Sequence, residues 1–254
     1  MRLSRGLAST LVFALIFVQS APGVIPLLTD DADTVEPQKF QLNFGGQLGK
    51  MAGERLSVFP VNLVTGVNSH GEVSATFGYQ SRDGVGPGPD SASASGATDL
   101  FLATKWQLWR TADSAFKLST RLDLKLPLAS RSSGFGTGRV DSGLVLIATR
   151  SCGATALDWN IGYAAIDLPH GATGDDRWFL GQAVREKLDE RWTLIGETFA
   201  VLPHTGQGGS ANFYFSGGAQ LTLRENLLIS ALIGSAAGRH SPDLTSSVGL
   251  TVVY

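Results

Sequence analysis

Hydrophobic and polar residues alternate strictly through residues 116–126, FKLSTRLDLKL. Every second side chain is apolar or neutral, and the opposite face carries four charges, at Lys117, Arg121, Asp123 and Lys125. A side-chain period of two predicts a β-strand, because a helix would scatter these residues around its circumference. The charged face cannot be packed dry without a large desolvation cost. Two arrangements remain: a soluble sheet with its charged face in water, or a membrane barrel with a wet lumen.

The same alternation continues from Lys39 to Tyr254. We expect strands at residues 39–48, 56–67, 72–79, 99–109, 116–126, 141–149, 155–163, 178–187, 192–202, 213–223, 227–234 and 244–254. About twelve strands is an even number, and their lengths suit tilted membrane crossings. Pro60 interrupts the second strand, so we expect it where a backbone donor is dispensable.

The connections between these strands differ in length. Tight turns are expected at 68–71, 111–113, 151–153, 189–190 and 224–226, and longer loops at 81–97, 129–138, 167–176, 203–210 and 235–243. After the first hairpin the two kinds alternate, which puts all the tight turns on one edge of an up-and-down sheet. This asymmetry is typical of outer-membrane barrels, with short periplasmic turns and longer extracellular loops. The predicted fold class is therefore an all-β, transmembrane, antiparallel up-and-down β-barrel of residues 39–254; a soluble secreted barrel is the alternative.

Aromatic residues fall near the predicted strand ends, where girdles meet lipid headgroups: Trp106, Trp109, Tyr163, Trp178, Trp192 and Phe213. The last strand alternates and ends on Tyr254, which resembles the C-terminal signal recognised by the outer-membrane assembly machinery. Outer-membrane lipid and that machinery are the expected partners, and the bacterial outer membrane is the expected location.

The N-terminus reads as an export signal. Arg2 and Arg5 precede an apolar run at residues 11–18 and small residues that suit cleavage after Ser20. The run is shorter than the roughly 20 residues of a spanning helix, so residues 1–20 are expected to be a cleaved signal peptide. Residues 21–38 form an acidic periplasmic lead-in, either a flexible extension or a small plug. Its four carboxylates do not follow the spacing of a calcium loop.

The rest of the composition excludes several functions. A net charge of −2 without a basic run argues against nucleic acid as a partner. No G-x-S-x-G motif is present, and no two histidines are spaced as metal ligands. The four histidines lie in expected turns and loops: His70, His170, His204 and His240. We therefore predict no enzyme activity and no catalytic, cofactor-binding or metal-binding residue.

The inward face of the predicted barrel is the candidate site. Its expected lumen-lining residues are Asp99, Phe101, Lys105, Lys117, Arg121, Asp123, Lys125, Asp158, Arg185, Lys187, Glu197, Phe199 and Tyr214. Twelve strands about 4.8 Å apart and tilted about 40° give a backbone diameter of roughly 24 Å. Side chains fill much of that width, so the charges either close a narrow barrel or line a path for small solutes.

Several short segments resemble a known outer-membrane family. They are Thr29-Asp30-Asp31, Thr34-Val35-Glu36, Lys39 to Asn43, Gly96 to Leu100, Lys125-Leu126-Pro127 and Gly134 to Asp141. Together they resemble the family labelled "MetA-pathway of phenol degradation", whose members are transporter-like barrels associated with the catabolism of aromatic compounds. The resemblance implies uptake of small, often hydrophobic compounds and carries no catalytic residues. The predicted function is passage of small organic solutes, aromatic or hydrophobic ones included. The alternative is a closed structural or loop-binding barrel without transport.

Overall fold

The computed structural model describes residues 27–51, 54–84, 93–130, 135–167, 176–204, 211–238 and 242–254. The expected signal peptide, His170 and His240 lie outside these residues. Across the part of the chain that is described, no helix has the length and hydropathy to cross a membrane.

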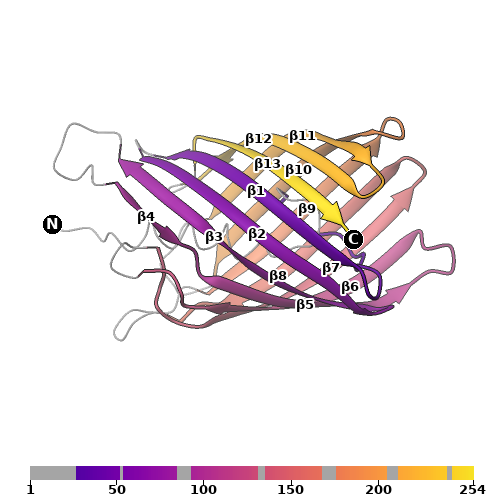
Figure 1. The fold of residues 1–254 in the computed structure, drawn as a ribbon, viewed down its shortest axis with the longest axis horizontal. Helices are drawn as coiled ribbons and strands as arrows, with labels where there is room; N and C mark the ends of the chain where they lie inside the picture. Colours follow the sequence, from indigo (N-terminus) through magenta and orange to yellow (C-terminus); the bar gives the residue numbers. More distant parts are fainter. Residues whose placement is uncertain are drawn as a thin grey trace.

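The described chain is built from antiparallel β-strands that wind around one axis (Figure 1). The strands are β1 (Phe40–Met51), β2 (Glu54–Asn68), β3 (Gly71–Gly84), β4 (Ala94–Ala97), β5 (Leu100–Arg110), β6 (Phe116–Leu126), β7 (Asp141–Cys152), β8 (Thr155–Ala165), β9 (Arg177–Lys187), β10 (Trp192–Pro203), β11 (Asn212–Arg224), β12 (Leu227–Ala237) and β13 (Leu244–Val253). Strands that follow each other in the sequence pair, except that β4 does not pair with β5. Both pair with β3 at different heights and so share one position in the barrel. The result is a closed barrel of 12 strands.

The first and last strands close the barrel. β1 pairs with β13 from Gln41↔Val253 to Lys50↔Leu244. At the end of this seam the backbone N–H of Phe40 donates to Tyr254 at 3.2 Å, and that of Tyr254 donates to Phe40 at 2.8 Å. β1 and β13 each gain a second partner strand at this seam, so neither presents an open edge to lipid.

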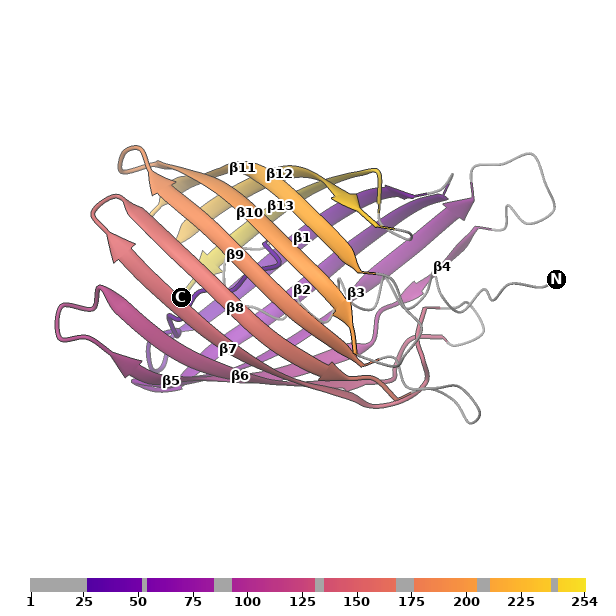
Figure 2. The ribbon, with the colours of Figure 1, turned by 180° about the vertical axis from the view of Figure 1, so that it is seen from behind.

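The tight turns gather at one end of the barrel, here called the turn end, and the strand ends that the longer connections join lie at the other, the loop end (Figure 2). At the turn end the backbone N–H groups of Trp192 and Arg191 donate to Asp189, which lowers the pKa of its carboxyl. The prediction that residues 81–97 form a loop is wrong in part. At the loop end, Ser81 and Arg82 continue β3 and pair with β4. The small residues of β4 carry no hydrophobic period, so this pairing left no signal in the sequence.

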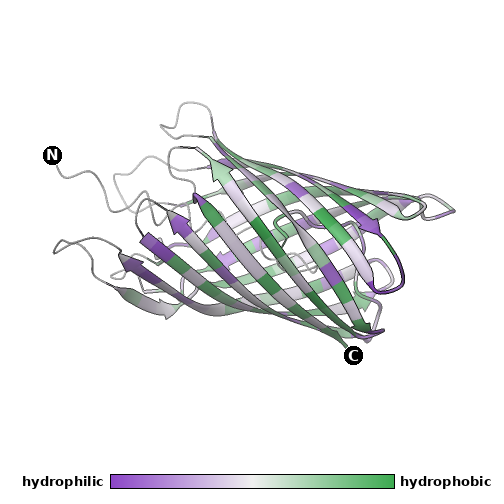
Figure 3. Ribbon diagram, turned by 90° about the horizontal axis from the view of Figure 1, so that it is seen from above, coloured by the Kyte–Doolittle hydropathy of each residue, from purple (hydrophilic) through white to green (hydrophobic). Residues whose placement is uncertain are grey.

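The two faces of the wall follow the predicted alternation (Figure 3). Leu122 is 54% exposed, whereas its neighbour Arg121 is 2% exposed. The girdle residues Trp106, Trp109, Trp178, Trp192 and Phe213 are all exposed, and Tyr163 is half-buried. The apolar surface therefore faces lipid and the charged surface faces the lumen.

Pro60 lies where a donor is dispensable, as expected. The pairing of β1 with β2 passes from Phe44↔Val61 to Gln47↔Val58 and omits Pro60. On its other side Pro60 lies opposite Gly78, in a continuous ladder with β3.

Candidate functional site

Residues 27–37, here called the lumen segment, lie inside the barrel. Leu28 belongs to a buried cluster with Ile166 and Val201 near the loop end. Pro37 forms a parallel bridge with Gly66 of β2 near the turn end, just before β1 begins. The expected assignment of this region as a periplasmic extension is wrong for these residues, and the plug alternative describes them. These residues lie in the lumen because the wall offers hydrogen-bond partners to their backbone. Bulk water outside the barrel would not hold them in one conformation.

Side chains of the wall hold the backbone of the lumen segment. Asn160 of β8 makes two bonds to Asp30, accepting from its N–H and donating to its carbonyl, both at 2.8 Å. Ala32 donates to Thr149 at 2.8 Å and accepts from Ser119 at 2.6 Å. Further bonds join Thr29 N–H to Glu197 and Val35 N–H to Glu72. These bonds supply the partners that buried backbone groups require.

Asp30 is the centre of a buried charge network. Its carboxylate lies 3.3 Å from Lys105 Nζ and 3.0 Å from Arg121 Nη1. Lys105 also lies 3.4 Å from Glu72, and Arg121 Nε lies 3.0 Å from Asp123. All five side chains are at most 3% exposed. Removing one member of such a network leaves a buried charge without a partner, which is strongly destabilising.

The other acidic residues of the lumen segment pair with separate cations. Asp31 lies 3.3 Å from Arg185 Nη1, and Arg185 Nε also lies 2.8 Å from Asp158. Asp33 pairs with Lys117. Asp30, Asp31 and Asp33 therefore each pair with different cations of the wall, Asp30 with two and the others with one. Among the described residues, no group of three His, Cys, Asp or Glu is placed to hold a metal ion.

A second charged group lies nearer the loop end. Lys125 of β6 pairs with Asp141 and lies 3.4 Å from Asp99. Asp99 also accepts the backbone N–H of Ala129 at 2.7 Å, and Lys125 donates to Thr137 at 2.8 Å. These bonds tie the connection that follows β6 to the inside of the wall.

An aromatic layer lies beside the two charged groups. Phe199 lies between Phe179, at a centroid distance of 6.1 Å, and Tyr214, at 6.5 Å. Phe101 and Leu28 belong to the same buried cluster. A void of about 10 Å³ separates Phe179 and Phe199 from Arg121 and Asp123, which is room for about one water molecule. These four side chains therefore leave little space between them.

The predicted lumen residues lie on the inside of the wall with one exception at the rim. Lys187 is exposed at the turn end of β9, although it has inward parity. Asn43 and Asn160 also face inward, as the alternation of their strands predicts. Sequence reasoning missed further inward residues of the same parity: Asn62, Glu72, Asp141 and Arg177. Their period-two spacing was a sufficient signal. Of the described histidines, His70 lies in a turn, and the His204 ring lies 5.8 Å from Tyr163.

Two wall glycines allow the lumen segment to touch the wall. A Cβ at Gly66 would lie 2.3 Å from the carbonyl oxygens of Val35 and Glu36. A Cβ at Gly181 would lie 2.8 Å from Thr29 Oγ1 and 3.0 Å from the Phe199 ring. Any larger residue at Gly66 has to push against backbone atoms, which cannot rotate away.

A row of polar side chains crosses the closure seam on the lumen side. Thr251 of β13 donates to Asn43 at 2.8 Å, Asn43 donates to Asn62 at 2.8 Å, and Asn62 donates to Thr76 at 2.7 Å. These residues are direct cross-strand partners. The row therefore fixes the relative register of four adjacent strands.

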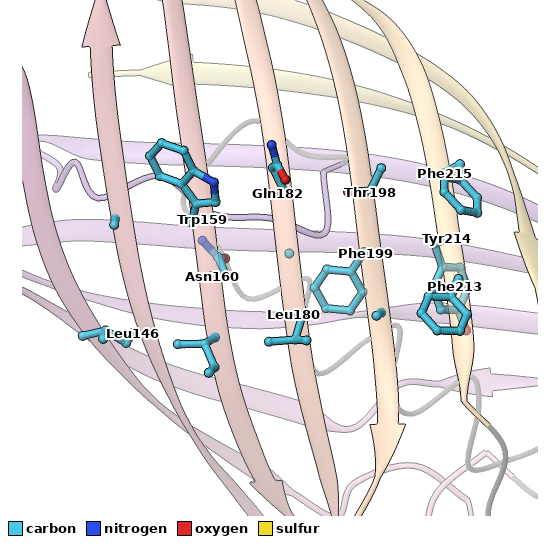
Figure 4. A pocket seen from close by; sticks show the side chains of 14 residues that line it. Leu146, Trp159, Asn160, Leu180, Gln182, Thr198, Phe199, Phe213, Tyr214 and Phe215 are labelled. Carbon is cyan, nitrogen blue, oxygen red and sulfur yellow. The ribbon is translucent and has the colours of Figure 1, made fainter.

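The outer wall carries a groove of about 420 Å³ over β7 to β11 (Figure 4). Trp159, Leu180, Phe213 and Phe215 line it, together with the lipid-facing polar residue Gln182. An apolar groove on a lipid-facing surface is suited to hydrocarbon.

The comparisons with known proteins agree with this architecture. A family model described as "Putative MetA-pathway of phenol degradation" matches residues 29–252. The structure is similar to an outer-membrane channel from Pseudomonas putida F1, with 14% identity, a TM-score of 0.69, and coverage of 88% of this chain and 97% of that chain. The NanC porin is similar at 8% identity and TM-score 0.58, covering 83% and 98%. The CymD monoaromatic hydrocarbon channel is similar at 10% identity and TM-score 0.52, covering 85% and 88%. The sequence matches no curated protein.

Proposed function

Since the chain belongs to the outer-membrane family of the MetA pathway of phenol degradation, we propose that it is a plugged passage for small organic solutes, aromatic and hydrophobic compounds included. The family's link to phenol degradation supports this solute class. The fold supports it too, because barrels of similar shape include channels and porins.

One observation carries the proposal: the lumen segment obstructs the barrel without being part of its wall. It is held by side chains such as Asn160 and Arg121, and every strand except the short β4 pairs on both sides without it. Displacement of the segment would therefore open the lumen while the strand ladder stays closed. The charges of the wall would then face a water-lined path and set its selectivity.

Uptake by cells tests the proposal. We expect initial uptake of a radiolabelled phenol to be faster in cells that carry the protein than in cells that lack it. Neutralising the buried pair with Arg121→Gln and Asp123→Asn should change the uptake rate beyond any change in protein level. Equal uptake with and without the protein would reject transport.

A closed structural barrel is the second candidate. The close approach of Arg121 and Phe199, with a void of about 10 Å³ between them, favours it. Under that function the double variant lowers stability and leaves uptake unchanged, so the same experiment separates the two.

A further inference from the structure

Leu28 of the lumen segment lies among side chains that suit a small organic molecule. It belongs to a buried cluster in the barrel with Val58, Phe101, Phe179, Phe199, Val201 and Tyr214. The preceding residue, Leu27, belongs to a separate cluster with Ile195 and Leu232. The two leucines are buried to similar extents: Leu28 is 8% exposed and Leu27 is 6% exposed. Only Leu28 is therefore grouped with aromatic rings.

Two polar residues at the edge of this cluster lack hydrogen-bond partners. The hydroxyl of Tyr214 and both amide atoms of Asn212 are buried, and no described residue bonds to them. Tyr214 is 5% exposed and Asn212 is 0% exposed. Buried polar groups in folded proteins are almost always bonded, so two adjacent exceptions require an explanation.

The register places these polar groups beside the rings. Tyr214 and Asn212 lie two residues apart on the inward face of β11, opposite Phe199 and Val201 of β10. The same face therefore presents an apolar wall and, directly next to it, unused donors and acceptors. The polar partners of the lumen segment elsewhere, such as Asn160 and Thr149, are bonded to it.

We propose that Leu28 occupies a solute site. The site would take a compact apolar body, of about the size of one ring, that bears a single hydroxyl or carbonyl group. This proposal rests on the proposed function and names a binding position and a chemical class for its solute.

The energetics favour exchange of Leu28 for such a solute. Replacing an alkyl side chain by an apolar ring keeps the apolar surface covered. The solute's polar group would also bond to Tyr214 or Asn212, which the leucine side chain cannot do. Because those groups are already buried without partners, the new bond recovers a penalty that the folded protein carries. A hydrocarbon without a polar group lacks this gain.

Ligand-observed fluorine NMR on the purified, refolded full-length protein tests the site. The probes are 4-fluorophenol and fluorobenzene, which differ only in the hydroxyl group. We expect saturable binding of 4-fluorophenol to the wild type and binding about ten-fold tighter to Leu28→Ala, which removes the internal competitor and leaves a cavity. Leu27→Ala is the matched control and should bind as the wild type does.

Tyr214→Phe tests the polar half of the site while keeping the ring. We expect it to reduce the preference for 4-fluorophenol over fluorobenzene by about five-fold, as the loss of one hydrogen bond does. A circular dichroism spectrum and heat-modified gel migration show that each variant forms the barrel.

Three results would overturn the site: absence of saturable binding to any variant, equal tightening by Leu28→Ala and Leu27→Ala, or an unchanged preference in Tyr214→Phe. Transport is measured separately. Binding without uptake would reject the proposed function and keep the site. Uptake without these binding differences would support the proposed function and reject the site.

Discussion

The Asp30 carboxylate lies 3.0 Å from Arg121 Nη1, and the two residues are 91 positions apart in the sequence. This contact joins the lumen segment to the middle of β6. Lys105 approaches the other oxygen of the same carboxylate at 3.3 Å. The segment is therefore fixed by charge at the level of the middle of β6.

Asp30→Asn should destabilise the protein through this contact. It leaves Lys105 and Arg121 facing a neutral amide in a buried site, and breaking such a network costs about 3–5 kcal/mol. Asp33→Asn is the control, because Asp33 is 52% exposed and an exposed pair contributes about 0–1 kcal/mol. Urea unfolding of the refolded protein measures both variants. Equal losses of unfolding free energy would contradict the central role of Asp30.

Gly66→Ala should lift the lumen segment from the wall. Its new Cβ would meet the carbonyl oxygens of Val35 and Glu36 at 2.3 Å, so the segment has to move. We expect faster hydrogen exchange at the amides of Ala32 and Val35. Gly196→Ala is the control, because a Cβ there has nothing within 4 Å. Unchanged exchange in Gly66→Ala would show that the segment does not depend on this contact.

Asn62→Ala should weaken the closure seam. The change removes the bond that Asn62 accepts from Asn43 and the bond it donates to Thr76, and each buried group left without a partner costs about 1–3 kcal/mol. The measurement is the unfolding free energy. Thr65→Ala, on the lipid-facing side of the same strand, is the comparison. The prediction fails if both variants unfold at the same denaturant concentration.

Deletion of Tyr254 tests the proposed recognition of the last strand by the assembly machinery. We expect the amount of protein in the outer-membrane fraction to fall several-fold, while Tyr254→Phe, which keeps an aromatic terminus, assembles as the wild type does. Refolding in detergent should be less affected, because the deletion removes two backbone hydrogen bonds with Phe40 and keeps the ladder of β1 and β13 from Gln41↔Val253 onward. Wild-type levels of the deletion variant in the outer membrane would argue against this partner.

The wall of the barrel could be predicted because it obeys a local rule. Leu122 and Arg121 differ by one position and face lipid and lumen, respectively, and a period of two records this difference in the sequence. The same rule would have identified Glu72 and Asn62 had it been applied to every strand. Membership of a strand and the direction of its side chains are both local properties.

The position of the lumen segment could not be predicted in this way. Its residues have no regular period, and their partners lie as far away as Glu197, 168 positions from Thr29. The acidic run was visible, but its match to Lys105, Arg121 and Arg185 depends on strand register around the whole barrel. The unpaired atoms of Tyr214 and Asn212 likewise appear only when contacts are known.

A tether between the lumen segment and the wall provides the most direct test of the central claim that this segment closes a solute path. A Cβ at Gly181 would lie 2.8 Å from Thr29 Oγ1, so Thr29→Cys with Gly181→Cys, in a Cys152→Ser background, places two thiols within reach of each other. Uptake of radiolabelled phenol is measured with the cross-link formed, as verified by mass spectrometry, and again after reduction. With the cross-link formed, we predict uptake no faster than in cells without the protein. After reduction, we predict that uptake returns to the rate of the uncross-linked protein. Equal uptake in both states would contradict the account.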